Sequence, residues 1–137
     1  MVLVDTSVII DFLKGVDNSQ VELLDTILDK KIPYGINDLI FQEVLQGARN
    51  IQEYRQLKEY LDSIPFYYLK QGKLSYECAA FMSYSCRRKG ITIRSTIDLL
   101  IAQTAIENNL FVLHKDGDFE NIAKVVPDLK IFKGMHP

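Results

Sequence analysis

Two aspartates follow apolar segments of the type that form buried strands. Asp5 comes directly after residues 2–4, and Asp116 follows residues 110–114, with Asp118 two positions further on. If the two segments are neighbouring parallel strands, these carboxylates project from the same edge of one sheet. They are the first candidates for a catalytic or metal-binding site.

Two further acids interrupt apolar sequence with helical spacing. Glu43 lies among Leu39, Ile40 and Val44, and Asp98 lies in the first turn of a predicted helix. An unpaired carboxylate buried in such a segment costs several kcal/mol of desolvation, so a compensating partner is expected. Each acid also has an ordinary explanation, namely a helix cap, a turn, a helix-dipole interaction or a solvated helix face. Their joint placement around one predicted crevice favours a functional site.

Carboxylates a few ångströms apart cannot all remain ionised unless protons or cations compensate their charges. Oxygen ligands without Cys or His favour Mg²⁺ or Mn²⁺. Such an ion leaves positions open for phosphate oxygens, lowers the pKa of a bound water and orients an in-line attack. The predicted chemistry is hydrolysis of a phosphate ester by metal-activated water.

The elements that must position these acids alternate along the chain. β-like runs are predicted at residues 2–4, 32–36, 64–69, 110–114 and 129–132. Helices are predicted at residues 8–13, 21–28, 38–48, 51–61, 74–85, 96–105 and 119–125. In the helix at 74–85, Leu74, Cys78, Phe81 and Met82 share one face. Pro65 suits an edge strand because proline gives no ladder donor.

Strands that alternate with helices pair in parallel through right-handed crossovers, with helices on both faces of the sheet. The predicted fold class is therefore α/β, a three-layer αβα sandwich around a five-stranded parallel sheet.

Length and composition limit the possibilities further. The chain has 137 residues, which is enough for one domain, and a single domain is predicted over 1–137. Its composition, with 47% hydrophobic and 25% charged residues, excludes a disordered chain and a collagen. No apolar run approaches the ~18 residues of a membrane span, and no basic segment opens a secretory signal. Cys78 and Cys86, about 12 Å apart on one helix, predict no disulfide. We expect a soluble protein of a reducing cytoplasm.

Sixteen basic and eighteen acidic residues give a formal net charge of −2. The chain as a whole therefore creates no basic field that would attract a nucleic acid. A polyanionic partner would need a local basic patch or metal ions.

Four segments carry a family resemblance: VDTSVII (residues 4–10), EVLQG (43–47), TIDLLIA (96–102) and LHKDGDF (113–119). In this order and at these separations, the chain resembles PIN-domain proteins, specifically VapC-type toxins of prokaryotic toxin–antitoxin pairs. The resemblance extends over essentially the whole length. A mild departure is Asn37-Asp38, where small hydroxyl residues are more usual, and it affects only the local loop.

The resemblance implies the following roles. The catalytic, metal-binding acids would be Asp5, Glu43, Asp98 and Asp116, with Asp118 as an accessory ligand and Thr6 or Ser7 as supporting hydroxyls. The protein would be a Mg²⁺- or Mn²⁺-dependent endoribonuclease that inhibits translation, with transfer RNA favoured over ribosomal RNA. It would form a homodimer and bind a VapB-like antitoxin, in a complex whose size the sequence does not predict, in the prokaryotic cytoplasm and without a membrane partner.

Basic residues near the predicted acids could hold RNA phosphates. The candidates are Arg87, Arg88, Lys89, Arg94 and Lys115. Cations at a helix end or in a turn have an equally simple structural explanation. His114, without a second histidine or a nucleophile nearby, is expected to be structural rather than a general base.

Two other functions remain open at this stage. The chain could be a catalytically silent PIN module that binds RNA or protein. Alternatively, Asp5 could act as the nucleophile of a phosphatase or receiver-like domain, although Asp5-Thr6-Ser7 lacks the second aspartate of an Asp-x-Asp loop.

Overall fold

The first strand, β1 (Val2–Val4), is buried along its whole length, as expected where helices cover both faces of a parallel sheet. The computed structural model describes residues 1–134; residues 135–137 of the predicted domain lie outside the described part. The other strands are β2 (Tyr34–Gly35), β3 (Phe111–Leu113) and β4 (Lys130–Ile131). All pairings are parallel, and the order across the sheet is β2-β1-β3-β4.

Seven helices connect and surround these strands in the described residues. They are α1 (Thr6–Leu13), α2 (Ser19–Asp29), α3 (Asp38–Gln46), α4 (Ile51–Asp62), α5 (Lys73–Arg88), α6 (Thr96–Glu107) and α7 (Gly117–Val125). Every predicted helix is therefore present. Most of them begin at a side-chain cap, since the side chains of Asp5, Asn18, Asn37, Asn50, Ser95 and Asp116 each accept a hydrogen bond from a backbone amide of the following turn.

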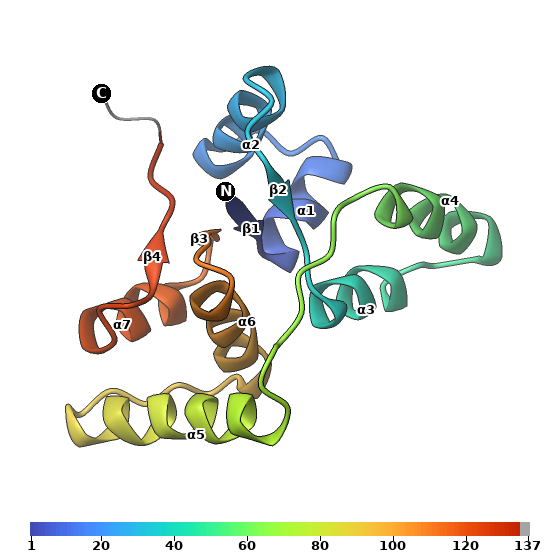
Figure 1. The fold of residues 1–137 in the computed structure, drawn as a ribbon. Coiled ribbons are helices and arrows are strands. Elements are labelled where there is room, and N and C mark those ends of the chain that lie inside the picture. Colours follow the sequence, from blue (N-terminus) through green and yellow to red (C-terminus); the bar gives the residue numbers. More distant parts are fainter. Residues whose placement is uncertain (135–137) are drawn as a thin grey trace.

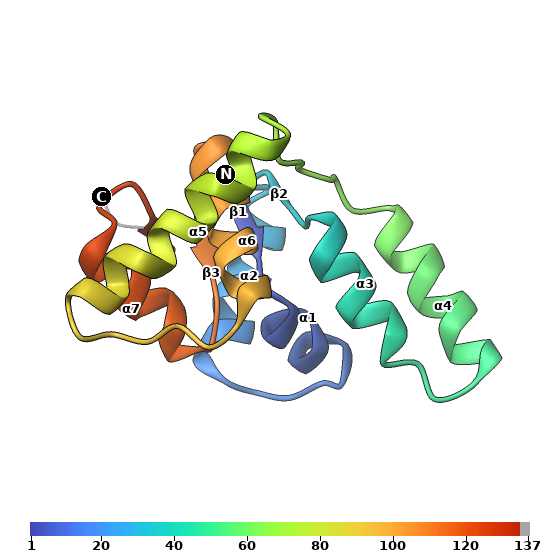
Figure 2. The same cartoon turned by 90° about the horizontal axis from the view of Figure 1, so that it is seen from below.

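Strand order and right-handed crossovers determine which helices share a face of the sheet. The chain leaves β1 toward β2 in one direction and leaves β3 toward β4 in the other, so α1 and α2 lie opposite α6 and α7. The contacts agree, because α1 packs on α2 whereas α5 packs on α6 and α7. Figure 1 shows α5 running past α6 and α7, and Figure 2 shows α3 and α4 as a pair that projects from the rest. The architecture is a four-stranded parallel sheet flanked by helices.

The predicted fifth strand, residues 64–69, is wrong: this segment forms only a bridge between Ile36 and Phe66. Ile36 N donates to the Pro65 carbonyl at 3.0 Å, and Tyr67 N donates to Ile36 O at 2.8 Å. Pairing ends there because Asn37 already caps α3, while the last turn of α4 precedes the segment. The five-stranded sheet is therefore corrected to four strands.

Close approach of this segment requires a glycine in β2. A Cβ atom on Gly35 would lie 2.4 Å from the Pro65 carbonyl oxygen and 2.6 Å from the Tyr67 ring. No side chain larger than hydrogen fits at this position.

The predicted apolar face of residues 74–85 is also partly wrong. Met82 is buried, but Leu74 is 48% and Phe81 64% exposed. The face of α5 turned to the protein is instead formed by small and medium side chains, including Ser75, Ala79 and Cys86. Hydrophobic spacing did not distinguish this face because both sides of α5 carry apolar residues.

The core fills the space between sheet and helices. Its largest fully buried side chains include Phe119 on α7, Leu3 on β1 and Ile101 on α6. Cys78 and Cys86 are free thiols, as predicted. In the part of the chain that is described, we find no helix with the length and hydrophobicity of a membrane span.

Candidate metal centre

Asp5 lies directly beyond β1, where its backbone N–H donates to the Leu113 carbonyl of β3 at 2.9 Å. Its side chain caps α1, with Oδ2 accepting from Ser7 Oγ at 2.7 Å and from Ser7 N at 3.3 Å. Only 5% of the residue is exposed. Burial raises the pKa of this carboxyl, the negative charge of Glu43 raises it slightly more, and the Ser7 hydrogen bonds oppose the shift.

Glu43 reaches the same region from α3. It is half-buried, and its Oε1 accepts a hydrogen bond from Thr6 Oγ1 at 2.7 Å. Since Thr6 follows Asp5, this bond holds the α3 carboxylate beside the start of α1. The hydroxyls of Thr6 and Ser7 thus each support one carboxylate.

Asp98 lies in the first turn of α6 and is 9% exposed. Its backbone N–H donates to the Ser95 hydroxyl at 3.1 Å, which fixes the beginning of the helix. Burial, followed by the negative charges of Asp5, Asp116 and Asp118, raises the pKa of Asp98 to about 7. The carboxylates beyond β1 and β3 are therefore close enough to α6 to repel one charge.

Asp116 and Asp118 lie at the beginning of α7, Asp116 just before its first residue and Asp118 in its first turn. Asp116 caps the helix, and its Oδ1 accepts from Asp118 N–H at 2.9 Å. One carboxylate oxygen each from Asp98, Asp116 and Asp118 lies within 4.8 Å of the other two. We call these three residues together with Asp5 the acidic cluster.

The acidic cluster lies at the point where the chain leaves neighbouring strands in opposite directions. β1 and β3 are adjacent, with Val4 paired to Leu113, and their connections run to opposite sides. Crevices for ligands form at this place in open α/β sheets. The donor set fits a hard divalent cation, because it offers only carboxylate oxygens and a cation would relieve their repulsion.

A model of the PIN domain family matches residues 2–125. The chain belongs to the PIN-domain family. Among curated proteins, this PIN domain is similar to VapC ribonuclease Mb1587 of Mycobacterium bovis and to ribonuclease VapC11 of Mycobacterium tuberculosis. Each is 27% identical over 126 residues, which cover 91% of this chain and 93% of the relative.

Solved structures of bacterial proteins have the same fold. A chain of VapBC2 from Rickettsia felis, bound to a promoter DNA fragment, superposes with a TM-score of 0.72 at 16% identity, covering 96% of this chain and 98% of that one. A chain of FitAcB from Neisseria gonorrhoeae gives 0.70 at 23% identity, with 97% of both chains covered. At these identities the similarity concerns the fold.

The structure also shows where the basic residues predicted to contact RNA phosphates lie relative to the acidic cluster of this PIN domain. Arg87, Arg88, Lys89 and Arg94 are all exposed at or after the end of α5, and no hydrogen bond or ion pair among the described residues joins them to the cluster. Lys115 lies next to Asp116, but its ammonium group pairs with Asp11 of α1.

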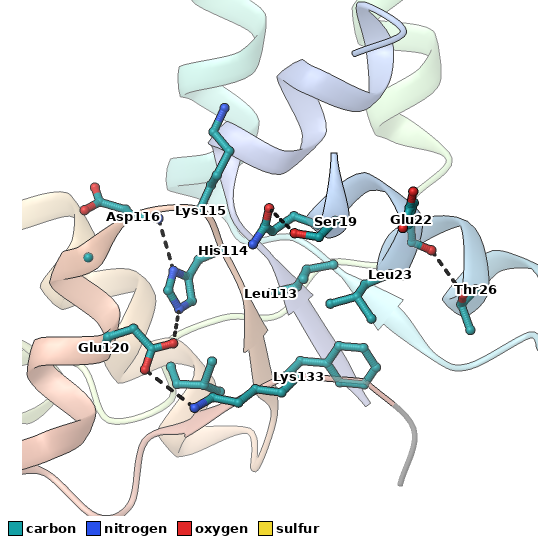
Figure 3. Close-up of a pocket in the computed structure, with 14 residues that line it drawn as sticks. Ser19, Glu22, Leu23, Thr26, Leu113, His114, Lys115, Asp116, Glu120 and Lys133 are labelled. Carbon is teal, nitrogen blue, oxygen red and sulfur yellow. Dashed lines mark hydrogen bonds and ion pairs between the residues drawn. The ribbon is translucent and has the colours of Figure 1, made fainter. Parts of the chain in front are cut away.

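A cavity of about 700 Å³ opens beside the cluster, between α2 and the β3–α7 segment. Asp116 of the cluster and its neighbour Lys115 line this cavity, whereas Asp5 and Asp98 do not. Figure 3 shows His114 and Glu120 on its wall, with Lys133 beyond Glu120.

Three supporting residues were not predicted for this role from the sequence. Asp11 pairs with Lys115, and buried Asn37 donates from its side-chain amide to Thr104 Oγ1 at 3.1 Å, which ties α3 to α6. His114 contacts the Asp116 amide. The contact of His114 is local, since Asp116 lies two residues further along the chain. The Asp11–Lys115 pair and the Asn37–Thr104 bond join segments that are far apart in the sequence, so they depend on tertiary structure.

Proposed function

We propose that this PIN domain is a Mg²⁺- or Mn²⁺-dependent endoribonuclease toxin of a type II toxin–antitoxin pair. The observation that carries the proposal is the burial of Asp98 against three other carboxylates, which raises its pKa to about 7. Such repulsion is costly without a cation, and PIN-domain membership and the VapC relatives favour a nuclease. The single domain would span residues 1–137.

The proposed metal ligands are Asp5, Glu43, Asp98 and Asp116, with Asp118 as an accessory ligand. A bound divalent ion would supply Lewis-acid activation of water and of the scissile phosphate. The chain's own residues orient the donors: Ser7 holds Asp5, and Thr6 holds Glu43. Neutralising the carboxylates would also let a polyanion approach a surface that otherwise repels it.

Transfer RNA is the proposed substrate, and a consequence of its cleavage would be inhibited translation. The exposed Arg87, Arg88, Lys89 and Arg94 are proposed phosphate contacts, as is Lys115 if RNA displaces Asp11 from it. The proposed partners are a second copy of the chain and a VapB-like antitoxin. Similar solved structures are those of VapBC2 from Rickettsia felis and VapBC-1 from Haemophilus influenzae, which supports this assignment.

The test is cleavage of a transfer RNA mixture with and without Mn²⁺. Asp98→Ala and Asp116→Ala should abolish cleavage while the fold is retained. Asp25→Ala, which removes an exposed aspartate of α2 outside the cluster, is the matched control and should cleave like the wild type. Full activity in Asp98→Ala would contradict the proposed site.

Cleavage without metal would contradict the proposed chemistry. Metal binding without cleavage of any RNA would instead support a catalytically silent PIN module. For the partner, a pull-down with the tagged chain should recover a small protein that binds it and suppresses cleavage; a bound protein that leaves cleavage unchanged would contradict the antitoxin assignment.

A further inference from the structure

His114 occupies an unusual place for a polar side chain. It follows β3 directly, its side chain is only 7% exposed, and its ring packs on that of Phe119 with centroids 5.1 Å apart. Removing an imidazole from water is costly unless its nitrogens find partners. The partners it has are therefore informative.

The Nδ1 atom of His114 accepts a hydrogen bond from the Asp116 N–H at 3.1 Å. An accepting Nδ1 carries no proton, so the ring is the neutral tautomer protonated at Nε2. Nε2 lies 3.4 Å from Glu120 Oε1 but makes no hydrogen bond to any described group, and Glu120 in turn lies 3.8 Å from Lys133 Nζ. Figure 3 shows the ring between the Asp116 amide and Glu120.

Two hydrogen bonds restrict the movement of Asp116, one to the His114 ring and one to a backbone amide of α7. The ring holds the backbone N–H of Asp116, and the Asp118 N–H holds its Oδ1 at 2.9 Å. Together the two bonds limit the backbone and side-chain rotations that move the Asp116 carboxylate relative to Asp98 and Asp118. The ring is itself rigid because it is buried against Phe119.

Satisfying the Asp116 amide does not by itself require a histidine. Asp116 is an exposed residue, so water could accept from its N–H. An apolar side chain of similar size would fill the space under α7 without the desolvation cost of an imidazole. What the imidazole adds is a fixed acceptor that orients a carboxylate of the cluster.

We propose that His114 is a positioning residue, whose Nδ1 holds the Asp116 amide so that the Asp116 carboxylate is oriented to bind a divalent cation. The inference rests on the proposed metal-dependent function and adds a residue to it. His114 touches neither the cation nor the substrate in this account.

The test compares His114→Leu with His114→Asn in the full chain. Leu fills a similar volume without an acceptor, whereas the Asn side-chain oxygen can take the place of Nδ1. Mn²⁺ affinity, measured by electron paramagnetic resonance at pH 8, should fall about 10-fold or more in His114→Leu, the usual effect of losing an outer-shell partner. It should return to within about threefold of the wild type in His114→Asn.

Equal Mn²⁺ affinity in His114→Leu and the wild type would overturn the inference and leave the proposed function intact. Equal loss in both variants would also overturn it, because the acceptor would then not be the relevant feature. A wild-type chain that binds no Mn²⁺ would contradict the proposed function together with the inference.

A measurement on the wild type covers the case in which His114→Leu does not fold. In ¹⁵N-labelled protein, the N–H···N bond should give a scalar coupling between the Asp116 amide nitrogen and Nδ1, with the ring proton on Nε2. A ring protonated at Nδ1, without this coupling, would overturn the proposal.

Discussion

At the residue scale, the surroundings of Asp98 disfavour the charged form of its carboxyl. Its pKa rises from 3.8 to about 7, mainly through burial and then through the neighbouring aspartates. Between these two values the folded chain keeps a proton that the unfolded chain has released. Unfolding therefore releases this proton, and the free energy of unfolding of the metal-free protein should fall as pH rises from about 4 to 7 and then level off. The raised pKa of Asp5 acts in the same direction.

Asp98→Asn tests this cost directly. At pH 8 and without metal, the variant should be more stable than the wild type by about 1 kcal/mol, since solvent screens part of the repulsion. Urea unfolding at pH 5 and pH 8 measures the difference, which should shrink at the lower pH because the wild-type carboxyl is then protonated. A variant less stable than the wild type at pH 8 would contradict the repulsion.

At the same scale, the grouping of Asp98 with Asp116 and Asp118 could be expected from the sequence because the positions of these acids follow from local rules, and their role as metal ligands stays a prediction. Asp5 directly follows β1, and Asp116 comes shortly after β3. Asp98 lies in the first turn of α6, which Ser95 caps. The contacts of Lys115 with Asp11 could not be predicted in this way, since the two residues are 104 positions apart and meet only in the tertiary structure.

At the element scale, Asn37 connects the two helices that bring Glu43 and Asp98 to the site. Its Oδ1 accepts from Ile40 N at 2.9 Å and caps α3, while its amide group donates to Thr104 on α6. Asn37 is fully buried, so no water replaces these bonds when the side chain is removed.

Asn37→Ala should lower the free energy of unfolding by about 2 to 3 kcal/mol, because a helix cap and a buried hydrogen bond are lost together. Asn50→Ala, which removes the exposed cap of α4, is the matched control and should cost about 1 kcal/mol. Urea unfolding of both variants gives the comparison. Equal losses would mean that the Asn37–Thr104 bond contributes nothing.

Strand 64–69 and the inward face of α5 are the elements that could not be predicted correctly. A β-like run of six residues pairs only where its neighbour is also extended, and beyond Ile36 the neighbouring chain turns into α3. The apolar spacing on α5 is compatible with a face packed against the protein interior and equally with an exposed apolar surface. Both outcomes depend on which parts of the protein lie beside the segment, and the residues of the segment alone do not specify these neighbours.

At the scale of the whole molecule, the exposed side of α5 is the surface where we expect the proposed homodimer to form. Large apolar side chains are exposed there, with the Phe81 and Tyr84 rings 5.7 Å apart, and a second copy would cover them. We expect sedimentation equilibrium to give twice the 15.7 kDa mass of one chain, and Phe81→Glu to shift the mass toward the monomer. A wild-type monomer at micromolar concentration would contradict the homodimer.

The central claim is that segments far apart in the sequence bring their carboxylates to one divalent-cation site. Anomalous diffraction from a crystal soaked in Mn²⁺ tests it most directly. The account predicts a manganese peak within coordination distance of Asp98 and Asp116. A crystal with Mn²⁺ bound elsewhere and none between these two carboxylates would contradict it.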